Sequence, residues 1–73
     1  MKKSLVAYIE RDPDTQLLIG EVPGIPGAHT QAESMDELIA NLKEVLELCL
    51  EEQKKSRIKI PQFVGVQEIE VSI

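Results

Sequence analysis

Four acidic side chains near the start of the chain are the first candidates for chemistry: Glu10, Asp12, Asp14 and Glu21. A two-metal nuclease needs several carboxylates that converge on its divalent ions. Glu10 and Glu21 lie in two segments rich in β-formers, where we expect them as cross-strand neighbours. Asp12 and Asp14 flank Pro13, as turn-forming residues do. No further acid is placed to converge with these four, so we expect solvated carboxylates and no metal site, cofactor or catalytic residue.

The chain has one histidine, His29, and one cysteine, Cys49. No second His or Cys lies near His29, so a metal site is not expected, and no nucleophile or orienting acid is spaced for general-base catalysis. Cys49 stands among apolar residues, where cysteine packs as a small hydrophobe, and the neighbouring Glu47 and Glu51 disfavour a reactive thiolate. We expect Cys49 in the core and His29 on a strand, with partner recognition as the alternative role for His29.

A long amphipathic helix is predicted from Ser34 onward, and its polar side is acidic. Ser34-Met35-Asp36-Glu37 has the form of a capping box. Apolar residues then recur at the spacing of a core-facing stripe: Met35, Leu38, Ile39, Leu42, Val45, Leu46, Cys49 and Leu50. The opposite side carries Glu44, Glu47 and Glu51. Such a face is usually only solvated, but it also suits docking of a basic protein, with carboxylates standing in for RNA phosphates.

Three short strands are predicted before this helix. β-Formers over Ser4–Glu10 and Gln16–Val22 enclose the Asp-Pro turn, so we expect an antiparallel hairpin. A third short strand is expected over Ala28–Gln31. Between the second and third strands, Pro23-Gly24 and Pro26-Gly27 force the chain through a sharp corner before it becomes extended again.

A last strand is predicted over Phe63–Ile73, where Ile69, Val71 and Ile73 alternate with polar residues. The order β-β-β-α-β, with one helix across one face of a small sheet, predicts an α+β fold of two layers. The last strand would be an exposed edge, and exposed edges pair with other chains. Together with the small core, this edge predicts a homodimer or homotetramer.

Composition limits the remaining possibilities. The 73 residues predict a single domain, residues 1–73, and only Tyr8 and Phe63 are aromatic, so the core must be aliphatic. The net charge of −5 would repel phosphate backbones, so we expect no direct nucleic-acid binding. No apolar run approaches the roughly 18 residues of a membrane span. A lone cysteine fits a reducing compartment, so we expect a cytoplasmic protein.

The corner and the helix together resemble a known family, the HicB-like antitoxins. The matching segments are Glu21-Val22-Pro23, Pro26-Gly27, Thr30-Gln31-Ala32, Met35-Asp36-Glu37-Leu38 and Leu46-Glu47-Leu48-Cys49-Leu50-Glu51. The resemblance covers nearly the whole chain and implies a partial, catalytically inactive RNase H-like unit. It also implies a small basic RNA-cleaving toxin, HicA-like, as the partner whose active site the antitoxin blocks.

One feature of many family members is missing from this sequence. They add a C-terminal DNA-binding module, whereas no residues follow the predicted last strand here, so we expect no such module. The expected function is therefore a non-catalytic antitoxin-type module that neutralises a HicA-like ribonuclease. The partner-binding residues we expect are Pro26, Gly27, His29, Glu44, Glu47 and Glu51. The alternatives are a homo-oligomeric scaffold without a toxin and, last, a metal-dependent nuclease.

Overall fold

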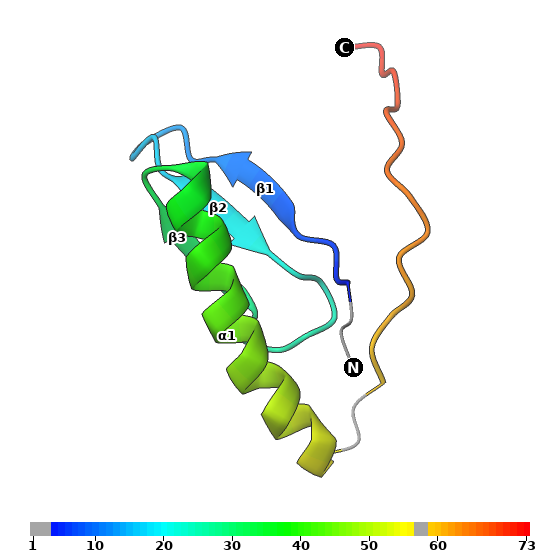
Figure 1. Cartoon of the computed structure of the whole chain (residues 1–73). Coiled ribbons are helices and arrows are strands. Elements are labelled where there is room, and N and C mark those ends of the chain that lie inside the picture. Colours follow the sequence, from blue (N-terminus) through cyan, green and yellow to red (C-terminus); the bar gives the residue numbers. More distant parts are fainter. Residues whose placement is uncertain (1–3, 57–58) are drawn as a thin grey trace.

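The structure is a computed structural model that describes residues 4–56 and 59–73. Three antiparallel strands form one sheet in the order β1-β2-β3, and a single long helix packs across one face of that sheet (Figure 1). The bounds of these elements are β1 Tyr8–Arg11, β2 Leu18–Glu21, β3 His29–Ala32 and α1 Met35–Ser56. The predicted α+β, two-layer design is confirmed for the β-β-β-α part of the chain.

The hairpin between β1 and β2 is held by a turn that reverses the chain at Asp12. The Asp12 amide donates to the Leu17 carbonyl at 2.9 Å, and the Gln16 amide donates to the Asp12 carbonyl at 2.8 Å. Gln16 completes the reversal with a left-handed backbone, φ 65°. The predicted hairpin is confirmed, and the pairing places Tyr8 opposite Glu21 and Glu10 opposite Ile19.

The two faces of the sheet have different surroundings. The helix-facing side includes Gly20 and Ala32, which are buried. Gly20 allows the helix to come close, because a Cβ at this position would lie 2.7 Å from Leu42 Cδ1. The other side, here called the outer sheet face, carries six side chains that are all exposed: Tyr8, Glu10, Ile19, Glu21, His29 and Gln31.

The helix begins where the capping motif predicted. Ser34 Oγ accepts a hydrogen bond from the Glu37 amide at 3.2 Å, and the Ser34 carbonyl accepts from the Leu38 amide at 3.0 Å. Within the predicted stripe, Leu38 and Leu42 are fully in the core, but Met35 and Ile39 are exposed. Each residue turns about 100° around a helix, so Ile39 points to the side of Leu38, where a narrow three-stranded sheet does not cover it.

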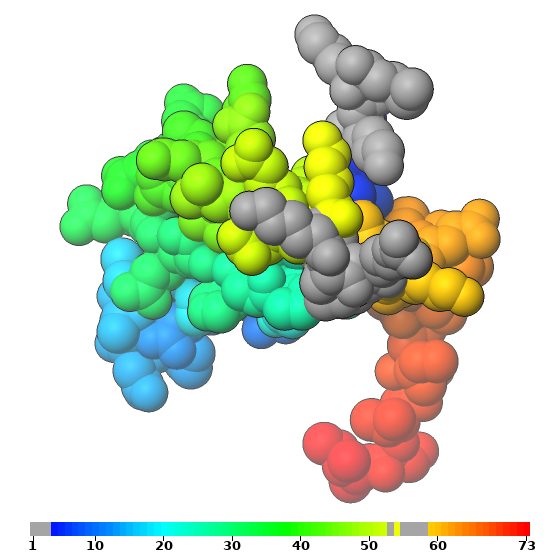
Figure 2. Space-filling view, turned by 90° about the horizontal axis from the view of Figure 1, so that it is seen from below, coloured from blue at the N-terminus to red at the C-terminus, as the bar shows by residue number. Residues whose placement is uncertain are grey.

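The predicted last strand is wrong for the single chain. Residues 59–73 follow an extended path but pair with no strand among the described residues, and every one of them is exposed. Alternation of apolar and polar residues favours a strand only where a neighbouring backbone supplies hydrogen-bond partners. Beyond Phe63 the segment runs away from the sheet, so no neighbouring backbone supplies these partners within the described part of the chain (Figures 1 and 2).

The core consists of two aliphatic clusters beneath the helix. Ala32, Leu38 and Leu42 form one, with Ala7 and Leu18 against them. The other is centred on the corner between β2 and β3, and it contains Val22, Ile25 and Ala28 with five half-buried neighbours: Leu5, Ala7, Leu46, Cys49 and Leu50. Cys49 thus packs against the core, as predicted.

Replacing Leu42 or Ile39 by alanine tests which side of α1 faces the core. Leu42 is 5% exposed and Ile39 is 55% exposed. We expect Leu42→Ala to lower the free energy of unfolding by about 2–5 kcal/mol, because it leaves a cavity against Gly20 and Ala32. Ile39→Ala should cost less than about 1 kcal/mol. Urea unfolding of both variants at one protein concentration measures the difference, and equal losses would contradict this orientation of α1.

Candidate protein-binding surfaces

The corner between β2 and β3 consists of two successive turns of the same kind. The Ile25 amide donates to the Val22 carbonyl at 3.4 Å, and the Ala28 amide donates to the Ile25 carbonyl at 3.1 Å. In each turn proline is the second residue and glycine the third, with φ of +85° at Gly24 and +81° at Gly27. This combination defines a type II turn, in which only glycine adopts the third position without strain. The predicted sharp corner is confirmed.

The two turns alternate buried and exposed residues in a regular way. Val22, Ile25 and Ala28 are 4%, 4% and 1% exposed and point under the helix. The Pro-Gly pairs between them face solvent, and Pro26 and Gly27 are both exposed. A Cβ on Gly27 would lie 3.6 Å from Cys49 Sγ, so this part of the corner lies beside the second half of α1.

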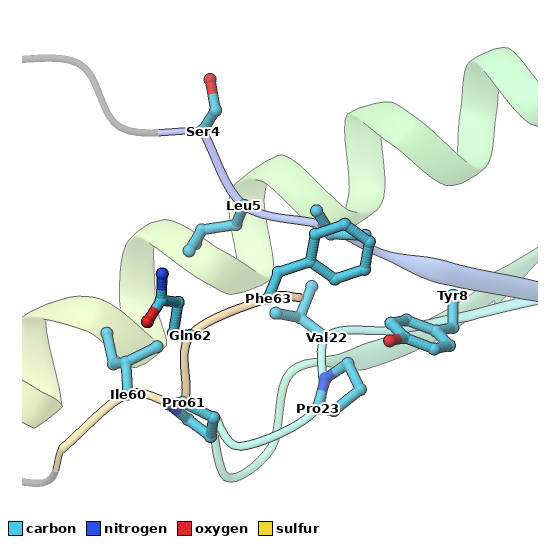
Figure 3. Close-up of a pocket in the computed structure, with 10 residues that line it drawn as sticks. Ser4, Leu5, Tyr8, Val22, Pro23, Ile60, Pro61, Gln62 and Phe63 are labelled. Carbon is cyan, nitrogen blue, oxygen red and sulfur yellow. The ribbon is translucent and has the colours of Figure 1, made fainter. Parts of the chain in front are cut away.

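The first turn of the corner also contacts the segment that follows the helix. A Cβ on Gly24 would overlap the Pro61 ring, so the two residues are in direct contact. Beyond Pro61, the ring of Phe63 meets Tyr8 edge to face, with the ring centroids 6.4 Å apart and the planes at 82°. Between these contacts lies an open hollow of about 310 Å³ (Figure 3). Its described lining contains no carboxylate, histidine or cysteine, and Tyr8 and Ser4 carry its side-chain hydroxyl groups.

The acidic row on α1 lies on the side of the helix away from the core. Glu44, Glu47 and Glu51 are all exposed, and their spacing places them on one face. Leu48 is 63% exposed, and it neighbours both Glu44 and Glu51 because it stands four residues after the one and three before the other. The row is therefore a strip of three carboxylates beside one exposed leucine.

His29 lies on a different surface from the acidic row. It is exposed on the outer sheet face, where it stands opposite Glu21, which in turn stands opposite Tyr8. The helix covers the other face of the sheet (Figure 1). The six residues predicted for partner binding thus fall into three places: the outer sheet face for His29, the corner for Pro26 and Gly27, and the helix for the three glutamates. No one flat surface includes them all.

The acids considered for metal chemistry are not brought together. Glu10 stands opposite Ile19 and Glu21 stands opposite Tyr8, so the two glutamates are diagonal cross-strand neighbours on the same face, as predicted. Asp12 is engaged within its own turn, where its carboxylate accepts from Thr15 Oγ1 at 2.7 Å and from the Thr15 amide at 2.9 Å. Over the described part of the chain, no three His, Cys, Asp or Glu side chains are grouped so that they could hold a metal ion.

Two exposed surfaces lie outside the six residues predicted for partner binding. One is the apolar part of the outer sheet face, where Val6, Tyr8 and Ile19 are between 37% and 44% exposed. The other is the segment after Phe63. The sequence predicted a single helix, and one helix can cover only one face of the sheet. The single helix was therefore the sequence signal that the outer sheet face stays exposed.

The chain is similar to proteins of one family in distant organisms. It is 45% identical over 71 residues to a UPF0150 protein of Thermotoga maritima, covering 97% of this chain and 93% of that protein. Identity is also 45% over 71 residues to a UPF0150 protein of Archaeoglobus fulgidus, covering 97% and 96%. A UPF0150 protein of Synechocystis is 41% identical over 70 residues, covering 96% and 97%.

No family model matches the chain, and no solved structure matches it significantly. Within residues 4–56 and 59–73 there is no helix with the length and apolar content needed to cross a bilayer.

Alanine substitutions at Gly24 and Gly27 distinguish the free-energy cost of backbone strain from the cost of steric overlap. Both glycines have positive φ, so Gly27→Ala should lower the free energy of unfolding by about 1–2 kcal/mol. Gly24→Ala should cost clearly more, because its Cβ also meets the Pro61 ring. In a Pro61→Ala background the excess should vanish, since Pro61 Cβ itself lies 3.5 Å away. Urea unfolding of the single and double variants measures these costs. Equal costs of Gly24→Ala and Gly27→Ala in the chain that keeps Pro61 would refute the contact.

The Asp12 turn predicts a pH effect at the acidic end of the scale. The Thr15 hydroxyl, and then the Thr15 amide, lower the pKa of Asp12 below its usual 3.8. A carboxylate with a lowered folded-state pKa stabilises the fold above its unfolded pKa, and this stabilisation disappears as the pH falls through the folded-state pKa.

Thr15→Val removes the hydroxyl donor and keeps the amide, so the pKa of Asp12 should rise part of the way towards 3.8 in an NMR titration of the side-chain carboxyl carbons. Thr30→Val, on β3, is the control and should leave the Asp12 titration unchanged. An unchanged Asp12 titration in Thr15→Val would show that the hydroxyl does not bond to the carboxylate.

Proposed function

The chain belongs to the UPF0150 family, and we propose that it is a non-catalytic protein-binding module of the antitoxin type. Its partner would be a small basic ribonuclease of the HicA-like class, whose catalytic surface the module covers. The observation that carries this proposal is the exposed row of Glu44, Glu47 and Glu51 on the side of α1 away from the core. The resemblance to HicB-like antitoxins in the corner and helix supports it.

The acidic row has the chemistry that a basic nuclease recognises. A surface that binds RNA carries Lys and Arg for the phosphates, and a row of carboxylates offers the same charge in a fixed arrangement. With a rise of about 1.5 Å per residue, the carboxylates are spaced roughly 5 and 6 Å apart along the helix axis. The net charge of −5 would steer a basic partner towards the module and keep nucleic acids away from it.

Leu48 gives the row an apolar contact next to its charges. Protein interfaces combine a desolvated centre with a polar rim, and an exposed leucine between carboxylates fits that pattern. The corner residues Pro26 and Gly27 lie beside the second half of the same helix, so a partner that extends over the end of the acidic row would reach them. His29, on the outer sheet face, would need a second contact region.

A second function is favoured by a separate observation. The segment after Phe63 exposes Val64, Val66, Ile69, Val71 and Ile73, and such a segment suits assembly of the chain with itself. A homo-oligomeric scaffold without a toxin is therefore the second candidate. No observation on the described residues favours the metal-dependent nuclease.

Reversing the charge of the acidic row tests the antitoxin proposal. The experiment uses a HicA-like ribonuclease encoded next to this chain, with binding measured by calorimetry and inhibition by RNA cleavage. The unmodified chain should bind the ribonuclease and stop cleavage at a fixed ratio. Replacing Glu44, Glu47 and Glu51 together by lysine should weaken binding at least about 100-fold, since close interfacial charge pairs couple by roughly 1.5 kcal/mol or more.

The matched control replaces three exposed acids away from the acidic row, Glu10, Asp14 and Glu33, by lysine. It changes the net charge by the same amount, so it should slow association but leave the complex intact. Equal losses in both triple variants would show that only net charge matters. No binding by the unmodified chain would refute the antitoxin proposal and leave the scaffold.

A further inference from the structure

The segment after Phe63 is an unpaired strand-like element that the single chain leaves in solvent. Val64, Val66, Ile69 and Val71 are 92%, 77%, 75% and 74% exposed. Figure 2 shows the end of the chain projecting from the body, and Figure 1 shows the same departure from the sheet. The radius of gyration, 14.1 Å, exceeds the roughly 11 Å expected for a compact chain of this length. So many exposed apolar side chains on an extended backbone indicate a missing partner.

The same chain has an incomplete sheet edge at β1. In the sheet order β1-β2-β3, β1 is paired only with β2. Among the described elements, α1 packs against β2 and β3 but not against β1. The helix-facing residues of β1 and of the segment just before it are therefore poorly covered. Ile9 is 39% exposed, and Leu5 and Ala7 are only half-buried. An added strand at this edge would satisfy the free backbone groups of β1 and enclose these side chains.

We propose that the segment Gln67–Ile73 of one copy pairs along the β1 edge of a second copy, and that two copies exchange these strands reciprocally. The side chains of Ile69, Val71 and Ile73 then cover the uncovered side of Leu5, Ala7 and Ile9. Glu68, Glu70 and Ser72 alternate with them and face water. The donor strand and the acceptor edge belong to the same chain, so a two-fold pair satisfies both at once and leaves neither exposed.

The way in which the segment after Phe63 leaves the body favours exchange between copies over folding back on the same copy. Phe63 is held against Tyr8, and Gly65 follows with open space around it, so the chain can swing away at this point. Val64 and Val66 also stand on the opposite side of an extended strand from Ile69, Val71 and Ile73. One flat surface cannot cover both sets, whereas a strand that passes from its own body to a second one meets two surfaces.

Two neighbouring positions provide a matched pair of variants. Val71→Glu places a carboxylate on the side that would cover β1, and Ser72→Glu places the same group on the side that faces water. We expect the unmodified chain to sediment at twice its 8.2 kDa mass, or at an even multiple of it. Val71→Glu should weaken this association at least about 100-fold with the helical circular dichroism retained, and Ser72→Glu should sediment like the unmodified chain.

Isotope-filtered NMR on a mixture of labelled and unlabelled chains locates the strand directly, and it does so without any variant. Contacts between the methyl groups of Ile69, Val71 or Ile73 and those of Leu5, Ala7 or Ile9 should appear between the labelled and unlabelled copies. A monomer, the same contacts within one copy only, or equal effects of the two substitutions would each overturn the proposal. This inference does not rest on the antitoxin function, and the charge-reversal experiment would still decide that function if strand exchange failed.

Discussion

The double turn between β2 and β3 is the constraint on which the rest of this structure depends. Two type II turns follow one another without a spacer, and each needs glycine at a positive φ, Gly24 and Gly27. Their regular alternation brings Val22, Ile25 and Ala28 under the helix at intervals of three residues. In a chain with two aromatic residues, this corner supplies half of the buried core, so the position of α1 depends on it as much as on the sheet.

Local signals in the sequence predicted the local structure well. The capping serine, the Asp-Pro hairpin and the Pro-Gly corner each depend on residues within a few positions of one another, and all three are confirmed. The register of the hairpin was not predictable to one residue, because the turn holds Gln16 in a left-handed conformation that its residue type does not favour. The observed register places Glu10 opposite Ile19.

Features that depend on contacts between elements distant in the sequence were harder to predict. Alternation over Phe63–Ile73 predicted a strand, yet a strand also needs an edge, and the pattern does not say whose edge it is. The stripe on α1 likewise included Met35 and Ile39, which are exposed because the sheet beneath is narrow. For the binding residues, spacing placed Glu44, Glu47 and Glu51 on one face correctly, but it could not show that His29 lies on the outer sheet face, away from α1.

The two proposed interfaces use separate parts of the molecule, and this separation has a physical consequence. Strand exchange would occupy the β1 edge, which α1 does not contact, and it would bury side chains on the core side of the sheet. The acidic row is on the far side of α1, so pairing of two copies would leave both rows in solvent. Each pair would then present two identical acidic strips, and two identical basic partners, or one symmetric partner, would be bound on opposite flanks. In the proposed pair, repulsion between like-charged helix faces would also oppose further stacking. Strand exchange and this repulsion would together favour a closed, discrete assembly with its charged helices facing outward.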